Sequence, residues 1–193
     1  VVVFKEKGAA DDGLPFIDVH KSDWFYDYVK YVYEKGLFKG VTPTLFAPED
    51  NLTRAMLVTV LYRAEGSPEM TKPSGFEDVA ADTYYAAAVA WAAENGIVNG
   101  FTDGRFQPDT LITRQQLAAI LYRYDTYRGH TPQGSAALNG YADAASVESW
   151  AAEAMSWANG NGLVTGVTPT TLVPNGTATR AQVAVILSRY TDQ

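Results

Sequence analysis

The sequence predicts a mainly α protein made of three helix–loop–helix repeats with little β-strand. Three observations support this fold class. The stretch from Leu52 to Arg63 recurs twice, and its apolar residues keep helical spacing in each copy. An aromatic residue lies 12 positions before a glycine in every copy, and a proline lies six positions before an arginine. One unit is too small to bury its apolar stripe alone, whereas three units can share a core.

Composition limits the classes of partner and fold. The chain has 193 residues, of which 47% are hydrophobic, and this supports a packed core. The net charge of −7 and the lack of a basic cluster argue against nucleic acid and anionic membranes as partners. The absence of cysteine excludes disulfide scaffolds and cysteine-based zinc sites. No apolar run approaches the roughly 18 residues of a membrane-spanning helix.

The first 15 residues do not follow the repeat pattern. We expect residues 1–15 to be a tail or a linker from an upstream domain, with a single strand or a helical extension as the alternative. The chain begins Val1-Val2-Val3, without Met or a signal-peptide pattern. We therefore expect a fragment or a processed chain whose targeting segment lies elsewhere.

Three repeats follow, and we expect them to form one composite domain. Their predicted bounds are 16–66, 76–128 and 141–193. The segments between them, 65–75 and 128–140, are rich in Gly, Pro, Ser and Thr, which is typical of linkers.

The first helix of each repeat is predicted between an early polar residue and a glycine. In the first repeat Ser22 or Asp23 is the expected N-cap, and the helix is expected to stop at Gly36. The same stop is expected at Gly96 and Gly162. A second glycine follows four residues later in each repeat and indicates a tight turn or a close backbone approach; these glycines are Gly40, Gly100 and Gly166.

The second helix of each repeat is predicted to begin just after a threonine. Thr53, Thr113 and Thr179 are good N-caps, because the hydroxyl can accept a hydrogen bond from an early backbone N–H. Gln116 and Gln182 lie three residues after their threonines and complete capping boxes. Met56 takes this place in the first repeat, so that repeat is expected to have no capping box.

An arginine follows the capping threonine in every repeat. A cation in the first helical turn opposes the helix dipole at a cost of about 0.3–1 kcal/mol, yet Arg54, Arg114 and Arg180 all lie there. Free N–H groups at a helix start, together with a guanidinium, favour an anion. The sequence thus predicts an anion site made three times. The alternative is that each arginine pairs with a carboxylate of the protein or lays its stem on an aromatic ring.

The order of these motifs resembles that of S-layer homology domains. The second repeat is most similar: it reads Phe76-Glu77-Asp78-Val79, then Gly96-Ile97-Val98-Asn99-Gly100, then Phe101-Thr102-Asp103-Gly104, and ends on Ile112-Thr113-Arg114. The first and third repeats have Thr-Pro in place of Asp-Gly in the loop. The resemblance covers residues 16–193.

The resemblance implies a non-covalent cell-wall anchor on the outside of a Gram-positive bacterium. It implies a pseudo-threefold helical bundle with three inter-repeat grooves, which bind anionic, often pyruvylated, secondary cell-wall polysaccharide. A fusion to an upstream surface protein or enzyme is expected, with location in the cell wall or S-layer. The ligand-binding residues that the resemblance implies are Arg54, Arg114, Arg180, Asp18, Asp78, Asp143, Trp24, Tyr84, Trp150, Gly40, Gly100 and Gly166.

Each of these residue types also has a structural explanation. The aspartates are at least as well explained as caps, or as partners that orient the arginines. The glycines are alternatively required only for backbone conformation. Trp24 or Trp150 can stack on a sugar face, and ordinary core packing is the alternative for both. Trp91 and Trp157 are out of step with the motif aromatics and are expected in the core. Lys39 is expected to be an exposed surface lysine.

No catalytic motif is present, and we expect neither an enzyme nor a cofactor or metal site in this segment. His20 and His130 share no motif and are expected in exposed loops. The alternative function is a helical protein–protein adaptor whose grooves take acidic peptides. If the arginines serve the ligand more than the core, Arg114→Ala is expected to weaken wall binding with little loss of helicity.

Overall fold

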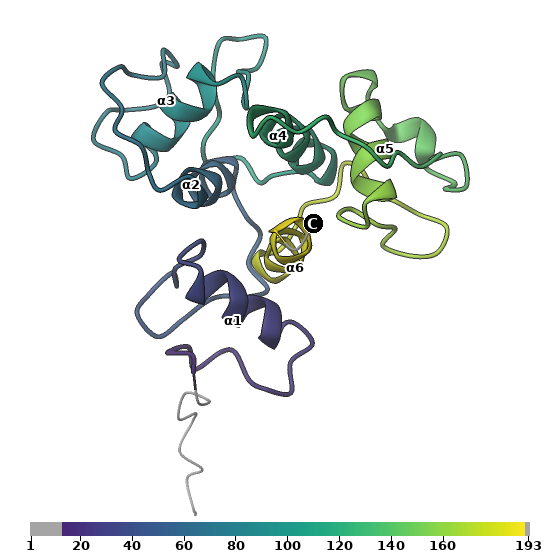
Figure 1. Cartoon of the computed structure of the whole chain (residues 1–193), viewed down its shortest axis with the longest axis horizontal. Coiled ribbons are helices and arrows are strands. Elements are labelled where there is room, and N and C mark those ends of the chain that lie inside the picture. The colour runs from purple at the N-terminus through teal and green to yellow at the C-terminus, as the bar shows by residue number, and fades with distance from the viewer. Residues whose placement is uncertain (1–12, 192–193) are drawn as a thin grey trace, which may run out of the picture. The chain divides into compact units, whose positions relative to one another are not determined.

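The computed structural model describes residues 13–191, and this part of the chain is mainly helical, as predicted (Figure 1). No strand longer than an isolated bridge occurs among these residues. The tail predicted for residues 1–15 lies almost entirely outside the described residues. The helices are α1 (Tyr26–Glu34), α2 (Arg54–Ala64), α3 (Ala86–Glu94), α4 (Arg114–Tyr127), α5 (Ala152–Gly160) and α6 (Arg180–Thr191), with short 3₁₀ turns η1 (Ala144–Ser146) and η2 (Ser149–Ala151).

The first helix of the first repeat, α1, starts later than predicted, and α1, α3 and α5 have no side-chain cap. The expected cap at Ser22 or Asp23 is wrong, because the Asp23 carboxylate accepts from the His20 N–H in a turn that precedes α1. The predicted stops are confirmed. Gly36, Gly96 and Gly162 follow the helix ends with φ of 70°, 67° and 67°, a left-handed conformation that only glycine adopts at little cost.

The caps of the second helices agree with the sequence. Thr113 and Gln116 exchange both hydrogen bonds of a capping box, and Thr179 and Gln182 do the same. In the first repeat the Thr53 hydroxyl accepts from the Met56 N–H, and the reciprocal bond is missing because methionine has no acceptor there.

Helices pair across repeats rather than within them. The second helix of one repeat packs on the first helix of the next, giving the pairs α2 with α3 and α4 with α5. The last helix, α6, packs on α1. Figure 1 shows each pair side by side. Each repeat therefore buries its apolar stripe with help from another repeat, as expected for units too small to fold alone.

The chain divides into two compact units. One consists of residues 13–50 with 179–191, so it joins α1 and α6 from the two ends of the sequence. The other is residues 51–178, with α2 to α5. Trp91 and Trp157 are 2% and 4% exposed, which confirms that they belong to the core.

Within residues 51–178, the segments that precede the second helices bond to one another. The Leu52 N–H donates to the Ala178 carbonyl at 2.9 Å, and the Ile112 N–H donates to the Leu52 carbonyl at 2.8 Å. Thr53 and Leu111 form an isolated bridge, and so do Thr113 and Thr177. These bonds join three distant stretches of chain and fix where α2 and α4 begin.

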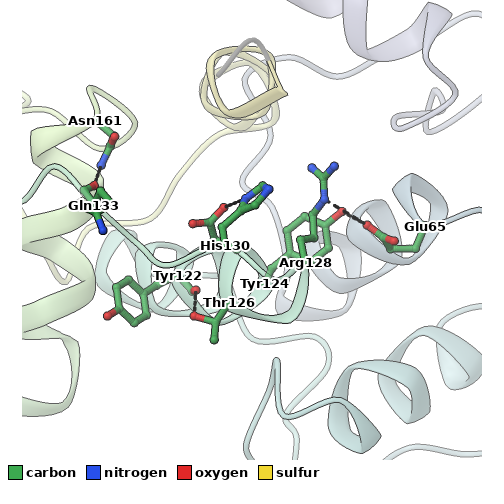
Figure 2. A network of polar contacts seen from close by, with 9 residues as sticks. Glu65, Tyr122, Tyr124, Thr126, Arg128, His130, Gln133 and Asn161 are labelled. Carbon is green, nitrogen blue, oxygen red and sulfur yellow. Dashed lines mark hydrogen bonds and ion pairs between the residues drawn. The ribbon is translucent and has the colours of Figure 1, made fainter.

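Polar side chains from other parts of the chain contact both linkers (Figure 2). The Tyr124 hydroxyl donates to Glu65 at the start of the first linker. The Asn161 amide donates to the Gln133 carbonyl in the second linker, at 2.7 Å. His20 and His130 are exposed and lie in loops, as predicted, and His130 pairs with Asp125 at 2.7 Å. No helix in the described part of the chain has the length and apolar character needed to cross a membrane.

Candidate ligand-binding groove

The backbone N–H groups at the starts of α2, α4 and α6 are not free. The Arg54 N–H donates to the Thr110 carbonyl and the next N–H donates to the Pro108 carbonyl. Arg114 and Arg180 repeat this pattern with carbonyls of Gly176 and Asp50. The third N–H of each helix goes to its threonine cap. The expectation that free N–H groups hold an anion is therefore wrong, because backbone carbonyls of the preceding loops satisfy these donors.

The arginine side chains are buried and hold a loop. Arg54, Arg114 and Arg180 are 5%, 8% and 5% exposed. Their Nε groups donate to the carbonyls of Phe106, Leu172 and Phe46 at 2.9, 2.8 and 2.7 Å. Arg114 and Arg180 also donate through Nη2 to the carbonyls of Thr165 and Lys39. Each arginine thus binds the loop of a different repeat from its own.

We call the surroundings of each buried arginine side chain its socket. In two of the three sockets, aromatic rings lie against the guanidinium. The Arg54 guanidinium lies over Phe101 and Phe106, 4.6 and 4.8 Å from their ring centres. Arg180 lies over Phe38 and Phe46 in the same way. Of the two alternatives to anion binding, the aromatic one is realised for Arg54 and Arg180.

The motif aspartates cap the same loops. Asp78 accepts from the N–H groups of Phe106 and Gln107 at 2.9 and 2.7 Å. Asp18 accepts from Phe46 and Ala47, and Asp143 from Leu172 and Val173, at matching distances. Each carboxylate therefore fixes the residue whose carbonyl receives the arginine Nε. This arrangement is the loop cap that the sequence offered as an alternative to ligand contact.

Hydrogen bonding to its ionised form lowers the pKa of Asp143, chiefly through the Leu172 N–H, with Arg114 adding to the effect. A lowered carboxyl pKa stabilises the fold above the ordinary value of 3.8, and this contribution is lost as the pH falls through the folded-state pKa.

The second residue that each aspartate holds has positive φ although it is not glycine. Ala47, Gln107 and Val173 have φ of 57°, 57° and 53°. A β-branched side chain fits this conformation worst. We expect Val173→Asn to raise the free energy of unfolding by about 1 kcal/mol, because asparagine tolerates the left-handed region. Thermal unfolding measures this, and Val167→Asn, at an exposed valine of the same repeat without positive φ, should give no gain.

The connector glycines lie against the backbone of the loops. A Cβ on Gly40 would lie 2.2 Å from the Thr42 carbonyl oxygen, and one on Gly166 would lie 2.3 Å from that of Thr168. At Gly100 the nearest atom is on the Phe76 ring, at 2.5 Å. The close approach that the sequence indicated is present, and it brings the loop backbone beside the arginine sockets.

The motif aromatics point outward. Trp24, Tyr84 and Trp150 are 62%, 65% and 51% exposed, in contrast to the buried Trp91 and Trp157. Trp150 lies in η2, which packs against α4. Large exposed rings are available to contact a ligand.

A cavity within residues 51–178 brings several of these residues together. Its volume is about 330 Å³. The second repeat contributes its connector and one face of α4, while Arg54 and Trp150 come from the first and third repeats. The lining residues are Arg54, Val98, Asn99, Gly100, Phe101, Thr102, Gln116, Ala119, Ile120, Arg123 and Trp150. Of the predicted site residues, Arg54, Gly100 and Trp150 meet here.

The charge in this cavity is positive. Arg54 and Arg123 are the charged residues in its lining, and no carboxylate lines it. The pKa of Arg54 is lowered to about 10, chiefly by burial and in smaller part by the nearby Arg123, while Asp78 opposes the change. Burial also lowers the pKa of Arg123. Both groups remain cationic at neutral pH, so the cavity concentrates positive charge in a chain of net charge −7.

Arg123 was not among the predicted site residues. The sequence does contain a pattern that points to this residue. In each repeat the second helix carries an arginine nine residues after the motif arginine: Arg63, Arg123 and Arg189. Gln116, Ala119, Ile120 and Arg123 lie on one helix face at spacings of three and four, which directs them to the same cavity.

Comparison with known proteins also finds three tandem repeats. The S-layer homology domain model matches residues 15–55, 75–118 and 140–184. An endoglucanase of Bacillus sp. (strain KSM-635) is 33% identical over 92% of this chain, and a surface-layer 125 kDa protein of Lysinibacillus sphaericus is 32% identical over 87%. A cellulosome-anchoring protein of Acetivibrio thermocellus is 27% identical over 78%.

The chain spans only 19%, 14% and 34% of the lengths of these three relatives. The enzyme and the surface proteins therefore share a portion of their length with this chain and differ elsewhere. What they share is the three-repeat region, and the chain belongs to the S-layer homology domain family, as a cell-surface anchoring module associated with the cell wall or S-layer.

Proposed function

We propose that this chain anchors a surface protein or enzyme by binding anionic, pyruvylated secondary cell-wall polysaccharide. The observation that carries the proposal is the cavity at Arg54 and Arg123, where two cations face a space without a carboxylate. An acidic sugar needs a guanidinium for its carboxylate and an apolar or aromatic wall for its ring. Val98, Phe101 and Trp150 supply that wall.

In this proposal some of the remaining predicted site residues contact the ligand, and others act on it indirectly. Gly100 lets the loop backbone reach the ligand, and Trp150 covers the sugar. Asp78 acts through the loop that it caps. The proposal assigns corresponding roles to the equivalent residues of the other repeats: Arg114, Arg180, Asp18, Asp143, Trp24, Tyr84, Gly40 and Gly166.

We also propose that this chain is fused to a surface protein or an enzyme. Relatives of this chain include enzymes and surface proteins several times its length. A module of this kind is expected to hold such a partner at the wall, while the partner supplies the activity.

Co-sedimentation with purified cell walls tests the proposal. Walls that retain their secondary polymer should pellet the chain, and walls stripped of the polymer by chemical treatment should not. Retention on stripped walls would contradict the proposal and favour the alternative, a protein or peptidoglycan partner.

Trp150→Ala should weaken binding to these walls with little change in thermal stability. The ring is half exposed, so its loss removes little core packing, but it removes the aromatic wall of the cavity. We expect a loss of about 1 kcal/mol, roughly fivefold in affinity for this groove. Trp150→Phe keeps an aromatic face and should retain most of the binding.

A further inference from the structure

We infer that Arg123 is the residue that contacts the acidic group of the ligand in this groove, while Arg54 mainly holds the loop that forms its wall. The inference rests on the proposed function and deepens it. It assigns the direct contact to a residue outside the Thr-Arg motif.

Of the two cations that line the cavity, Arg123 is the one whose guanidinium has no bonding partner among the described residues. Among the described residues its guanidinium makes no hydrogen bond, ion pair or ring contact. It is only partly exposed, and it lies close enough to another cation, Arg54, to lower the pKa of that group. A half-buried guanidinium costs free energy unless it is paired, so this position favours an anion from outside the chain.

Arg54 is committed to the protein. Its Nε donates to the Phe106 carbonyl, and its guanidinium lies over the rings of Phe101 and Phe106. Arg114 and Arg180, in their own sockets, also donate to loop carbonyls. A side chain held in this way places the loop, and it offers a ligand only the donors that remain.

The position of Arg123 on α4 suits it better than Arg54 for contact with a ligand in the cavity. It lies on the face of α4 with Gln116, which also lines the cavity, and Trp150 lines the same space. The chemistry therefore fits a sugar carboxylate that receives N–H groups from Arg123 while the ring rests beside Trp150.

The inference predicts an unusual combination for Arg123→Gln: weaker binding without loss of stability. Removing an unpaired, partly buried cation next to Arg54 relieves repulsion and desolvation, so the melting temperature should stay the same or rise. Removing a charge-assisted contact should lower affinity at this groove about tenfold or more.

The experiment uses the full chain labelled with ¹⁵N and follows the four indole N–H signals during titration. The probes are a pyruvylated amino sugar and the same sugar without the pyruvate. The Trp150 signal, assigned with Trp150→Phe, reports this groove alone. In the parent chain it should respond to the acidic sugar more strongly than to the neutral one.

Arg123→Gln should shift the Trp150 titration at least tenfold to higher sugar concentration, and Arg123→Lys should restore part of the affinity. Arg105→Gln, at an exposed arginine of the same unit, is the matched control and should titrate like the parent. Unchanged titration of Trp150 in Arg123→Gln would overturn the inference. Weaker binding accompanied by a lower melting temperature would overturn it too, because it would mean a structural role.

Different results would contradict the proposed function and the assignment of Arg123. If the parent chain does not bind polymer-bearing walls, the proposed function itself is wrong. If it binds those walls while Trp150 does not respond to the acidic sugar, the assignment of Arg123 is wrong and wall anchoring stands.

Discussion

Asp78→Ala is expected to lower the free energy of unfolding by about 3 kcal/mol, because it leaves two backbone donors of the Arg54 socket without an acceptor. The Phe106 and Gln107 N–H groups both donate to this carboxylate, and Phe106 is fully buried. The loop also places the carbonyl that accepts from Arg54 Nε. For a chain of this size the melting temperature should fall by about 6–12 °C.

Glu77→Ala is the matched control for this change. Glu77 is the adjacent acidic residue, it is exposed, and its loss should leave the melting temperature within about 2 °C of the parent. Asp78→Asn should fall between the two, since its amide keeps one acceptor oxygen. Equal stability of Asp78→Ala and Glu77→Ala would show that the loop needs no cap.

Arg114→Ala is expected to destabilise the fold by a similar amount, about 3 kcal/mol. Arg114 is 8% exposed, and its guanidinium donates to the carbonyls of Leu172 and Thr165. Truncation removes both donors and leaves a space at the start of α4. The sequence alone suggested a variant with intact helicity, because it could not show that the side chain is buried.

Urea or thermal unfolding followed by circular dichroism measures this effect. Arg105→Ala, at an exposed arginine, should show almost no change. A variant Arg114→Ala that unfolds like the parent but no longer binds walls would mean that the guanidinium serves the ligand rather than the loop.

Local signals predicted most of the fold. The Thr-x-x-Gln pattern gave the capping boxes of α4 and α6, and glycine placed the ends of α1, α3 and α5. These features depend on neighbours within about four residues, which a sequence displays directly. Trp91 and Trp157 were assigned to the core because the repeat phase separates them from the exposed aromatics.

The candidate site was harder to predict because its contacts are distant in sequence. Arg54 meets a carbonyl 52 residues away, and Asp78 caps N–H groups 28 and 29 residues away. Helical pattern does not show which repeat supplies the partner of an arginine. Arg123 was overlooked for a related reason: a charged residue near the end of a helix reads as solvated surface until the neighbouring repeat is placed beside it.

The packing of α6 on α1 has a practical consequence for anyone who shortens this protein. Removing the final helix takes away the partner of the opening helix, so the damage appears at the other terminus of the chain. Single repeats cannot be trimmed off as independent parts, and deletion series that assign binding to one repeat would confuse lost recognition with lost folding. Point substitutions are therefore the better way to determine how much each of the three repeats contributes to binding.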